Sequence, residues 1–201
     1  MTAIIDYDAG NLRSVAKALE ALGADSEVTR DRERILKADR VILPGVGSFG
    51  DAMEKLNQYG LTDVIREAVD SGKPFLGICL GLQLLFESSE ESPGTPGLGI
   101  LPGKILRIPD CPGLKIPHMG WNSLSIKPGA KLFQGVENGA YVYFVHSYYC
   151  KARDESIVAA STEYSTHIHA SVEKDNVFAC QFHPEKSSGV GLRILKNFLE
   201  L

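Results

Sequence analysis

The sequence predicts an α/β fold in which a mixed, largely parallel central sheet carries helices on both faces. In the first half of the chain, short apolar runs alternate with segments whose apolar residues recur at helical spacing. From residue 104 to 182 the pattern changes to short strand-like runs that glycine and proline interrupt. No internal repeat or linker divides the 201 residues, so we expect one domain over residues 1–201.

The first half predicts strands that alternate with helices. Leu12, Val15 and Leu19 lie on one face of a helix over residues 11–22, and Gly23 is suited to its end. A second helix is expected at residues 61–69. Strands are expected at residues 3–7, 27–29 (the weakest), 40–43 and 75–79. This alternation is typical of a parallel sheet with helices on both faces.

The second half predicts mainly strands. Residues 142–149 and 177–182 are its clearest strands, and residues 192–199 form a last helix. Residues 88–99 are rich in proline, glycine and serine and are expected to form a loop.

Composition excludes several classes of function. A net charge of −4 without clustered lysine and arginine argues against nucleic-acid binding. No apolar run reaches the roughly 18 residues that span a bilayer, and the first residues lack the basic start of a signal peptide. The cysteines at 79, 111, 150 and 180 show no metal or disulfide spacing, which favours a reducing, cytoplasmic compartment.

Residues 77–81, GICLG, follow an apolar run and precede a helical segment, LQLLF. This order predicts a nucleophile elbow with Cys79 as the nucleophile. The glycines on either side suit a crowded turn, and the following helix directs its positive end at the sulfur, which favours the thiolate.

His183 and Glu185 lie on either side of Pro184. Proline favours an extended residue before it, and in an extended segment residues i and i+2 point to the same side. Glu185 could therefore orient His183 as the base for a nucleophile. Cys79 and His183 both directly follow strands, so we expect them at the carboxyl edge of the sheet, where sites form in open α/β folds.

These residues resemble the class I (triad) glutamine amidotransferases. The stretches PGVGSFG at 44–50, PHMGWN at 117–122 and QFHPEKS at 181–187 are similar to those of glutaminase subunits of imidazole glycerol phosphate synthases. The resemblance runs from the first strand to the last helix and implies a flavodoxin-like fold. It also implies a heterodimer with a (β/α)8-barrel cyclase that uses ammonia in histidine biosynthesis, with no cofactor.

The resemblance assigns roles to further residues. It implies catalysis by Cys79, His183 and Glu185, with the Leu80 N–H as one oxyanion donor from the elbow geometry. The second donor is expected from the Val46–Gly47 stretch, where flanking glycines would let the Val46 peptide rotate as a switch. The implied glutamine contacts are Gln83, Glu91, Ser147 and Tyr148. The implied partner contacts are Asn11, His118, Trp121, Tyr143 and Lys186.

Several alternatives stay open on the residues alone. His167 and His169 alternate along a strand as metal ligands would, but no third ligand is apparent, so we expect no metal. His146 is expected to be structural, and Cys111, Cys150 and Cys180 receive no role. A glutaminase for another synthase, a cysteine peptidase or amidase, and a non-catalytic binding module are the competing functions.

Overall fold

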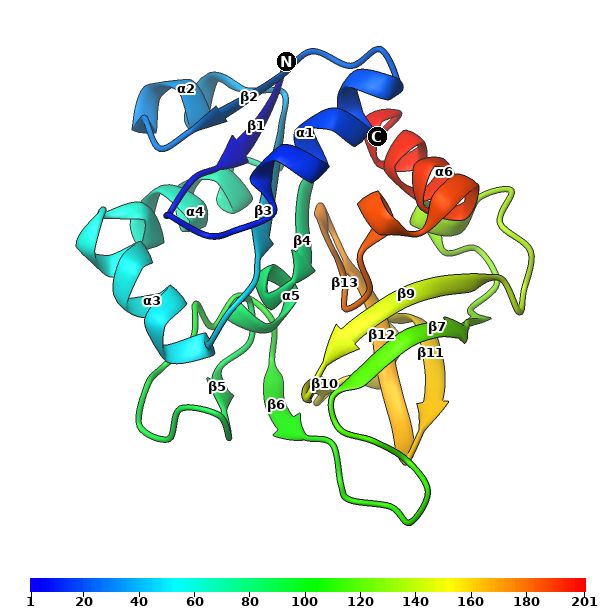
Figure 1. Ribbon diagram of the computed structural model, residues 1–201. Helices are drawn as coiled ribbons and strands as arrows, with labels where there is room; N and C mark the ends of the chain where they lie inside the picture. Colours follow the sequence, from blue (N-terminus) through cyan, green and yellow to red (C-terminus); the bar gives the residue numbers. More distant parts are fainter.

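The computed structural model describes residues 1–201, and its main feature is an 11-stranded mixed sheet (Figure 1). The strands of this sheet are β1 (Thr2–Ile5), β2 (Ser26–Thr29), β3 (Arg40–Gly45), β4 (Phe75–Cys79), β5 (Ser88–Ser89), β6 (Gly103–Arg107), β8 (Ser125–Ile126), β10 (Tyr148–Ala152), β11 (Val158–Tyr164), β12 (Thr166–Lys174) and β13 (Val177–Cys180). Their order is β2-β1-β3-β4-β13-β12-β10-β6-β5, and β11 pairs with both β12 and β8.

The first five strands in this order are mutually parallel. All residues of β1, β4 and β13 are buried, as expected for strands with both faces covered. The carboxyl ends of β4 and β13 lie side by side, because Ile78 pairs with Cys180. This edge therefore holds the residues that directly follow both strands.

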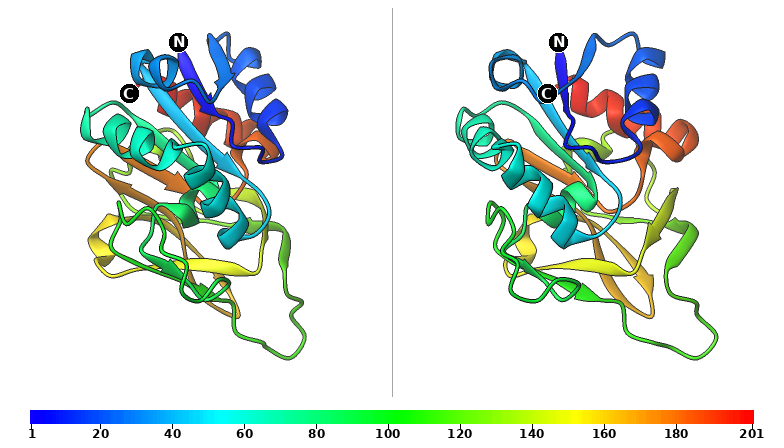
Figure 2. Two further views of the ribbon diagram at one scale, coloured as in Figure 1. Left: turned by 90° about the vertical axis from the view of Figure 1, so that its left-hand side faces the viewer. Right: turned by 60° about the vertical axis from the view of Figure 1, so that its left-hand side comes forward.

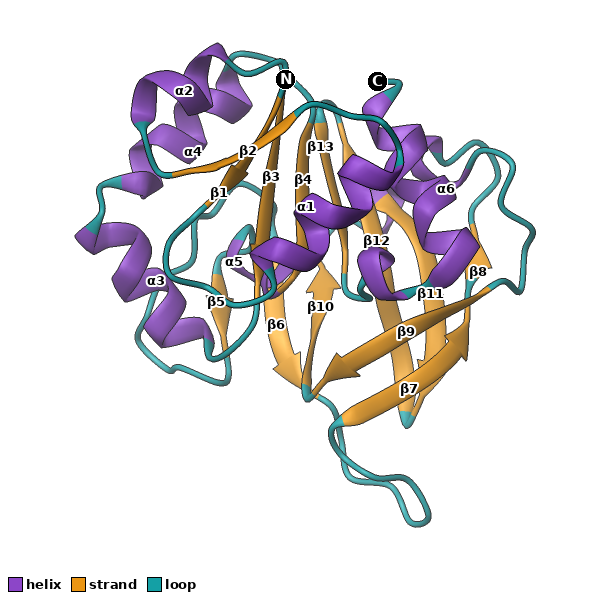
Figure 3. Ribbon diagram, turned by 45° about the horizontal axis from the view of Figure 1, so that its top comes forward, coloured by secondary structure: helices purple, strands orange, loops and turns teal.

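Helices cover both faces of the parallel strands, as the sequence predicts (Figure 3). They are α1 (Leu12–Ala21), α2 (Arg32–Lys37), α3 (Phe49–Gln58), α4 (Leu61–Asp70), α5 (Leu80–Leu84) and α6 (Ser188–Leu199), with short 3-10 turns at Lys131–Phe133, Glu155–Ile157 and Pro184–Lys186. The core on one face contains residues of α2, α3 and α4, and the core on the other contains residues of α1 and α6. The alternating side chains of β1 divide between these two cores.

The second half adds antiparallel strands and a separate ribbon. β12 pairs antiparallel with β13, β10 and β11, and β10 pairs antiparallel with β6. The ribbon consists of β7 (His118–Ser123) and β9 (Tyr141–His146), which pair only with each other. It lies across β11 and β12 (Figure 3). The loop between β6 and β7 projects away from the body of the molecule (Figure 2).

The predicted elements are confirmed with shifted ends, and several features differ from the prediction. β4 has the predicted bounds, whereas α2 and α3 were not predicted. The expected strand over 142–149 is two strands separated at Ser147, and the expected loop over 88–99 contains the short strand β5. The strand expected over 177–182 ends at Cys180. The first helix starts after Asn11, whose left-handed backbone precedes the first turn.

Candidate active site

The strand–turn–helix geometry predicted for the elbow is confirmed at Cys79, which ends β4 and directly precedes α5. Its φ is positive, at 55°, with ψ −110°, a conformation that a non-glycine residue adopts only when its surroundings impose it. The glycines at 77 and 81 are both required, because neighbouring backbone atoms leave no room for a β-carbon. A β-carbon on Gly81 would lie 1.8 Å from the Leu43 carbonyl oxygen, and one on Gly77 would lie 2.9 Å from the Gly81 oxygen.

His183 and Glu185 form the expected pair. Nδ1 of His183 donates to Oε1 of Glu185 at 2.7 Å, and their side chains are 1% and 0% exposed. The prediction that both residues belong to an extended segment is wrong, because Pro184–Lys186 is a 3-10 turn. His183 itself is extended, and the turn that follows returns the carboxylate to its ring. The Asn11 side chain also donates to Oε1 of Glu185.

The charge state of His183 reflects opposing effects. Burial disfavours its charged form, but Cys79 and Glu185 outweigh that effect and raise the pKa of His183 to about 9. Its Nε2 is buried without a hydrogen-bond partner and belongs to the ring that faces Cys79. The histidine is therefore suited to take up the thiol proton.

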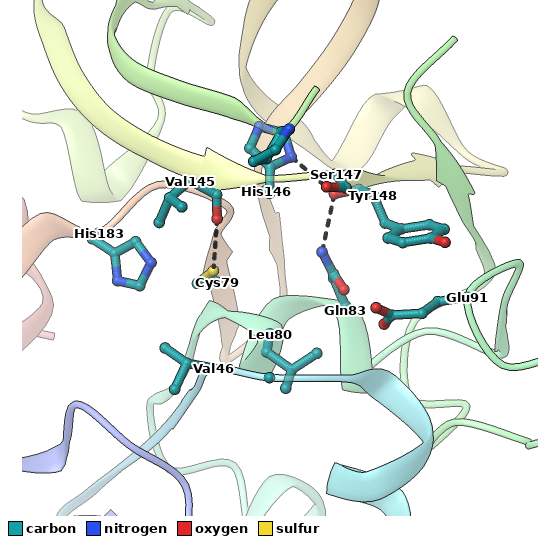
Figure 4. Close-up of a pocket in the computed structure, with 12 residues that line it drawn as sticks. Val46, Cys79, Leu80, Gln83, Glu91, Val145, His146, Ser147, Tyr148 and His183 are labelled. Atoms are coloured by element: carbon teal, nitrogen blue, oxygen red, sulfur yellow. Dashed lines mark hydrogen bonds between the residues drawn. The ribbon is translucent and has the colours of Figure 1, made fainter. Parts of the chain in front are cut away.

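A cavity of about 330 Å³ opens between these residues (Figure 4). This volume is at the small end of the range for ligand pockets. The cavity contains most of the predicted catalytic, oxyanion and substrate residues. The residues that line it are Val46, Gly47, Cys79, Leu80, Gln83, Glu91, Pro117, Val145, His146, Ser147, Tyr148 and His183.

Gln83 belongs to a buried network that includes a residue not assigned from the sequence. Nε2 of Gln83 donates to the Tyr148 carbonyl at 3.0 Å and to Oε1 of Gln181 at 3.1 Å. Gln181 is fully buried, and its Nε2 lies 3.7 Å from the sulfur of Cys79. The network therefore ties Cys79 to the wall of the cavity. Gln181 lies two residues before His183, and this proximity in sequence is the only signal that could have indicated its role.

Glu91 lines the cavity, but its carboxylate also has a structural partner. Oε2 of Glu91 accepts the Phe49 N–H at 2.8 Å, and the Ser92 hydroxyl accepts the Gly50 N–H at 3.0 Å. These bonds satisfy free N–H groups in the first turn of α3. They fasten the loop after β5 to the helix that follows the Val46–Gly47 stretch.

A chain of side-chain hydrogen bonds leads from the ribbon to the cavity wall. Nδ1 of His146 donates to the Tyr148 carbonyl at 2.8 Å, which leaves Nε2 of the neutral ring as the acceptor for Nδ1 of His118 at 3.0 Å. Burial lowers the pKa of His146 to about 3 and that of His118 to about 4, so both rings are neutral. Nδ2 of Asn122 lies 3.3 Å from the remaining nitrogen of His118.

The predicted partner contacts separate into two groups. Trp121 is 51% exposed on the ribbon and pairs across it with Tyr143. Lys186, which directly follows Glu185, is also exposed. The assignment of the His118 side chain to this surface is wrong, because it is only 3% exposed and stacks on Phe144.

Two apolar residues of the ribbon were not predicted as surface residues. Met119 is 62% exposed and Tyr141 is 59% exposed. With Trp121 and Tyr143 they define an outer face of the ribbon.

The two histidines that were considered as metal ligands make contacts that do not form a metal site. His169 is buried, and its Nδ1 accepts the Ala152 N–H at 3.2 Å, whereas His167 is exposed beside Glu163. No group of three or more histidine, cysteine or acidic residues is arranged to hold a metal ion. All four cysteines are free, and no helix is long and apolar enough to cross a membrane.

The family model and the curated relatives that match this chain point to the same family. The model of the class I glutamine amidotransferase family matches residues 3–201. The chain is 52% identical to imidazole glycerol phosphate synthase subunit HisH of Caldanaerobacter subterraneus, covering 100% of this chain and 98% of the relative. It is 54% identical to the protein of the same name from Moorella thermoacetica, over 99% and 94% of the two chains.

Solved structures give the same fold at lower identity. A glutamine amidotransferase crystal structure superimposes with a TM-score of 0.77 at 22% identity, over 98% of this chain and 97% of the other. A putative GMP synthase protein from Thermoplasma acidophilum gives a TM-score of 0.72 at 20% identity, over 100% and 92%. At these identities the likeness concerns the fold alone.

Proposed function

The chain belongs to the class I glutamine amidotransferase family, and we propose that it is the glutaminase subunit of an imidazole glycerol phosphate synthase in histidine biosynthesis. One observation carries the catalytic part of this proposal. The strained Cys79 at the elbow borders the same cavity as His183, whose ring is paired with the buried Glu185 carboxylate. The relatives that match over the full chain are named as subunits of this synthase, which supports the choice of pathway.

In the first half-reaction, the sulfur of Cys79 attacks the side-chain amide carbon of glutamine. His183 takes the thiol proton and returns it to the departing nitrogen, so ammonia leaves and a γ-glutamyl thioester remains. In the second half-reaction, His183 removes a proton from water as it attacks the thioester, and glutamate and the thiol are released. Glu185 orients the imidazole and stabilises its charged form.

The tetrahedral intermediates need donors for their oxyanion. The Leu80 N–H is the first, because Leu80 directly follows the nucleophile and lines the cavity. The Val46–Gly47 stretch borders the same cavity and supplies the second from its backbone. Removal of one oxyanion donor typically costs about 100- to 1,000-fold in rate. A peptide rotation that points the Val46 N–H into the cavity would therefore raise the rate of glutamine hydrolysis, and the opposite rotation would lower it.

The partner is a (β/α)8-barrel cyclase, and the outer face of the ribbon is its docking surface. This face exposes Met119, Trp121 and Tyr141 on a two-stranded ribbon, and aromatic and methionine side chains are enriched at protein interfaces. Ammonia then passes to the cyclase, which needs no cofactor on this chain. The four free cysteines are consistent with a cytoplasmic enzyme.

The ribbon also contacts the catalytic histidine through backbone bonds. The carbonyl of Tyr143 accepts the His183 N–H at 2.9 Å, and the Tyr143 N–H donates to the Ser187 hydroxyl at 2.9 Å. Lys186 lies between these two bonded residues and is exposed. A partner docked on the ribbon can therefore act on the site through Tyr143 and Lys186.

Replacement of Cys79 by alanine tests the proposal. In the complex with the cyclase, Cys79→Ala should abolish glutamine-dependent synthesis but leave ammonia-dependent synthesis intact, because free ammonia enters after the step that needs sulfur. Cys111→Ala is the matched control and should retain both activities, since Cys111 lies outside the cavity. Glutamine-dependent synthesis by Cys79→Ala would contradict the assignment.

A further inference from the structure

Four buried side-chain atoms have no hydrogen-bond partner: Nε of Arg40, Nε2 of His183, Oε2 of Glu185 and the hydroxyl of Tyr7. Roughly nine in ten buried polar groups in proteins are paired, so each exception calls for an explanation. Two of the four atoms belong to the catalytic pair. The Tyr7 hydroxyl is buried in the core, yet the proposed mechanism does not use it.

The Tyr7 hydroxyl lies against the strand that leads to the oxyanion stretch. Tyr7 follows β1, which pairs in parallel with β3, and it is 2% exposed. A β-carbon on Gly45 would lie 2.2 Å from the hydroxyl oxygen and 3.0 Å from the β-carbon of Leu80. Glycine at 45 is therefore what makes room for the hydroxyl.

Tyr7 approaches this strand end from the core and does not line the cavity. Val46 and Leu80 line the cavity, whereas Tyr7 does not and instead packs in a core cluster that contains Leu80. In a trans peptide the N–H and the carbonyl point in opposite directions. When the Val46 N–H turns toward the cavity, the Gly45 carbonyl turns away from it and leaves the solvent that the cavity admits. It would then be a buried acceptor that needs a donor.

We infer that Tyr7 is a positioning residue for the oxyanion hole, and that its hydroxyl donates to the Gly45 carbonyl when the Val46 N–H faces glutamine. This inference rests on the proposed function. Gly45 can make the rotation at little steric cost because it lacks a side chain. Burial and the charge of Cys79 raise the pKa of Tyr7, so the hydroxyl stays protonated and remains a donor. The two orientations of the peptide then differ by one buried hydrogen bond.

The test is Tyr7→Phe, which removes a single oxygen atom. In the complex with the cyclase, kcat for glutamine hydrolysis should fall by about tenfold, the size expected for one hydrogen bond, with KM for glutamine unchanged. The thermal midpoint should stay equal or rise, because the variant no longer buries an unpaired hydroxyl. Alkylation of Cys79 by iodoacetamide should keep its rate, because the hydroxyl acts on the peptide and not on the sulfur.

The control is Tyr149→Phe, which removes the hydroxyl of another buried tyrosine that does not line the cavity and should keep the wild-type kcat. An unchanged kcat in Tyr7→Phe overturns the inference. A lower kcat accompanied by a lower thermal midpoint, or by slower alkylation of Cys79, overturns it as well, because the residue would then act through stability or through the nucleophile. A wild-type complex that releases no glutamate overturns the proposed function and this inference with it.

Discussion

At the scale of single residues, the pair of His183 and Glu185 is held by groups from separate parts of the chain. Oε1 of Glu185 accepts hydrogen bonds from His183, two residues earlier, and from Asn11, 174 residues away. Both side chains of the pair are buried, so water does not compete for these bonds. The partner contact of Asn11 stays a prediction, and the structure directs its side chain at the Glu185 carboxylate. It can do so because its left-handed backbone lies just before α1.

Glu185→Gln should damage the enzyme less than His183→Ala. Loss of a general acid–base group costs about 100- to 10,000-fold in rate, and His183 is the only group that moves protons in both half-reactions. In Glu185→Gln, the side-chain amide oxygen at position 185 can still accept the hydrogen bond from His183, so only the negative charge is lost. We expect this loss to lower kcat by about 10- to 150-fold. Measurement of kcat for both variants in the complex decides this, and equal losses would mean that Glu185 takes part in proton transfer itself.

The raised pKa of His183 predicts a pH dependence of stability. The pKa rises from 6.5 to about 9 on folding, so the folded state binds the proton more tightly than the unfolded state. This contribution is fully present below about pH 6.5 and is lost as the pH rises toward 9. Denaturant unfolding across this range should therefore show a falling free energy of unfolding, with a shallower fall in Glu185→Gln. Parallel curves for the two proteins would show that Glu185 does not raise this pKa.

At the scale of elements, the elbow depends on the close packing of α5 against β3. Gly81 makes this approach possible, because a β-carbon at this position would lie only 1.8 Å from the Leu43 carbonyl oxygen. Gly81→Ala should force the two elements apart, destabilise the chain by about 1–3 kcal/mol or more and abolish glutamine hydrolysis. Gly189→Ala is the matched control, because a β-carbon on Gly189 meets nothing within 4 Å in the first turn of α6. If Gly81→Ala folds with wild-type stability and turnover, this elbow geometry is wrong.

Some elements that were not predicted had a readable signal in the sequence. In α3, the buried residues Phe49, Ala52, Met53 and Leu56 recur at helical spacing, and Ser48 caps the first turn.

On β7, His118 and Trp121 are three positions apart, and in a strand such residues point to opposite faces. Both side chains could therefore not lie on one docking surface. The prediction assigned the stretch at 117–122 to one surface and so overlooked this alternation of side chains.

Other parts of the site could not be predicted from local sequence. The elbow and the pair of His183 and Glu185 were predictable because each motif sets its own local geometry. Gln181 acquires its role from Gln83 and Cys79, which are about a hundred residues away, and Tyr7 acquires its role from Gly45. Such contacts arise only when strands distant in sequence become neighbours.

At the scale of the whole molecule, the ribbon of β7 and β9 connects the outer surface to the catalytic centre. Its outer face exposes Trp121, and its inner face buries His118 against His146, which lines the cavity. The backbone carbonyl of Tyr143 accepts the His183 N–H. A partner that shifts this ribbon would therefore move the histidine and the wall of the cavity together. This arrangement explains how docking can control hydrolysis at a buried cysteine.

The central claim is that this chain hydrolyses glutamine under the control of its partner. The most direct test is the rate of glutamate release per chain in three states: the free chain, the complex with the cyclase, and the complex with the cyclase ligand bound. We expect a nearly silent free chain and a rise in rate that is completed only when the ligand is bound, by about 100- to 1,000-fold if one oxyanion donor is gained. Equal rates in all three states would contradict the account.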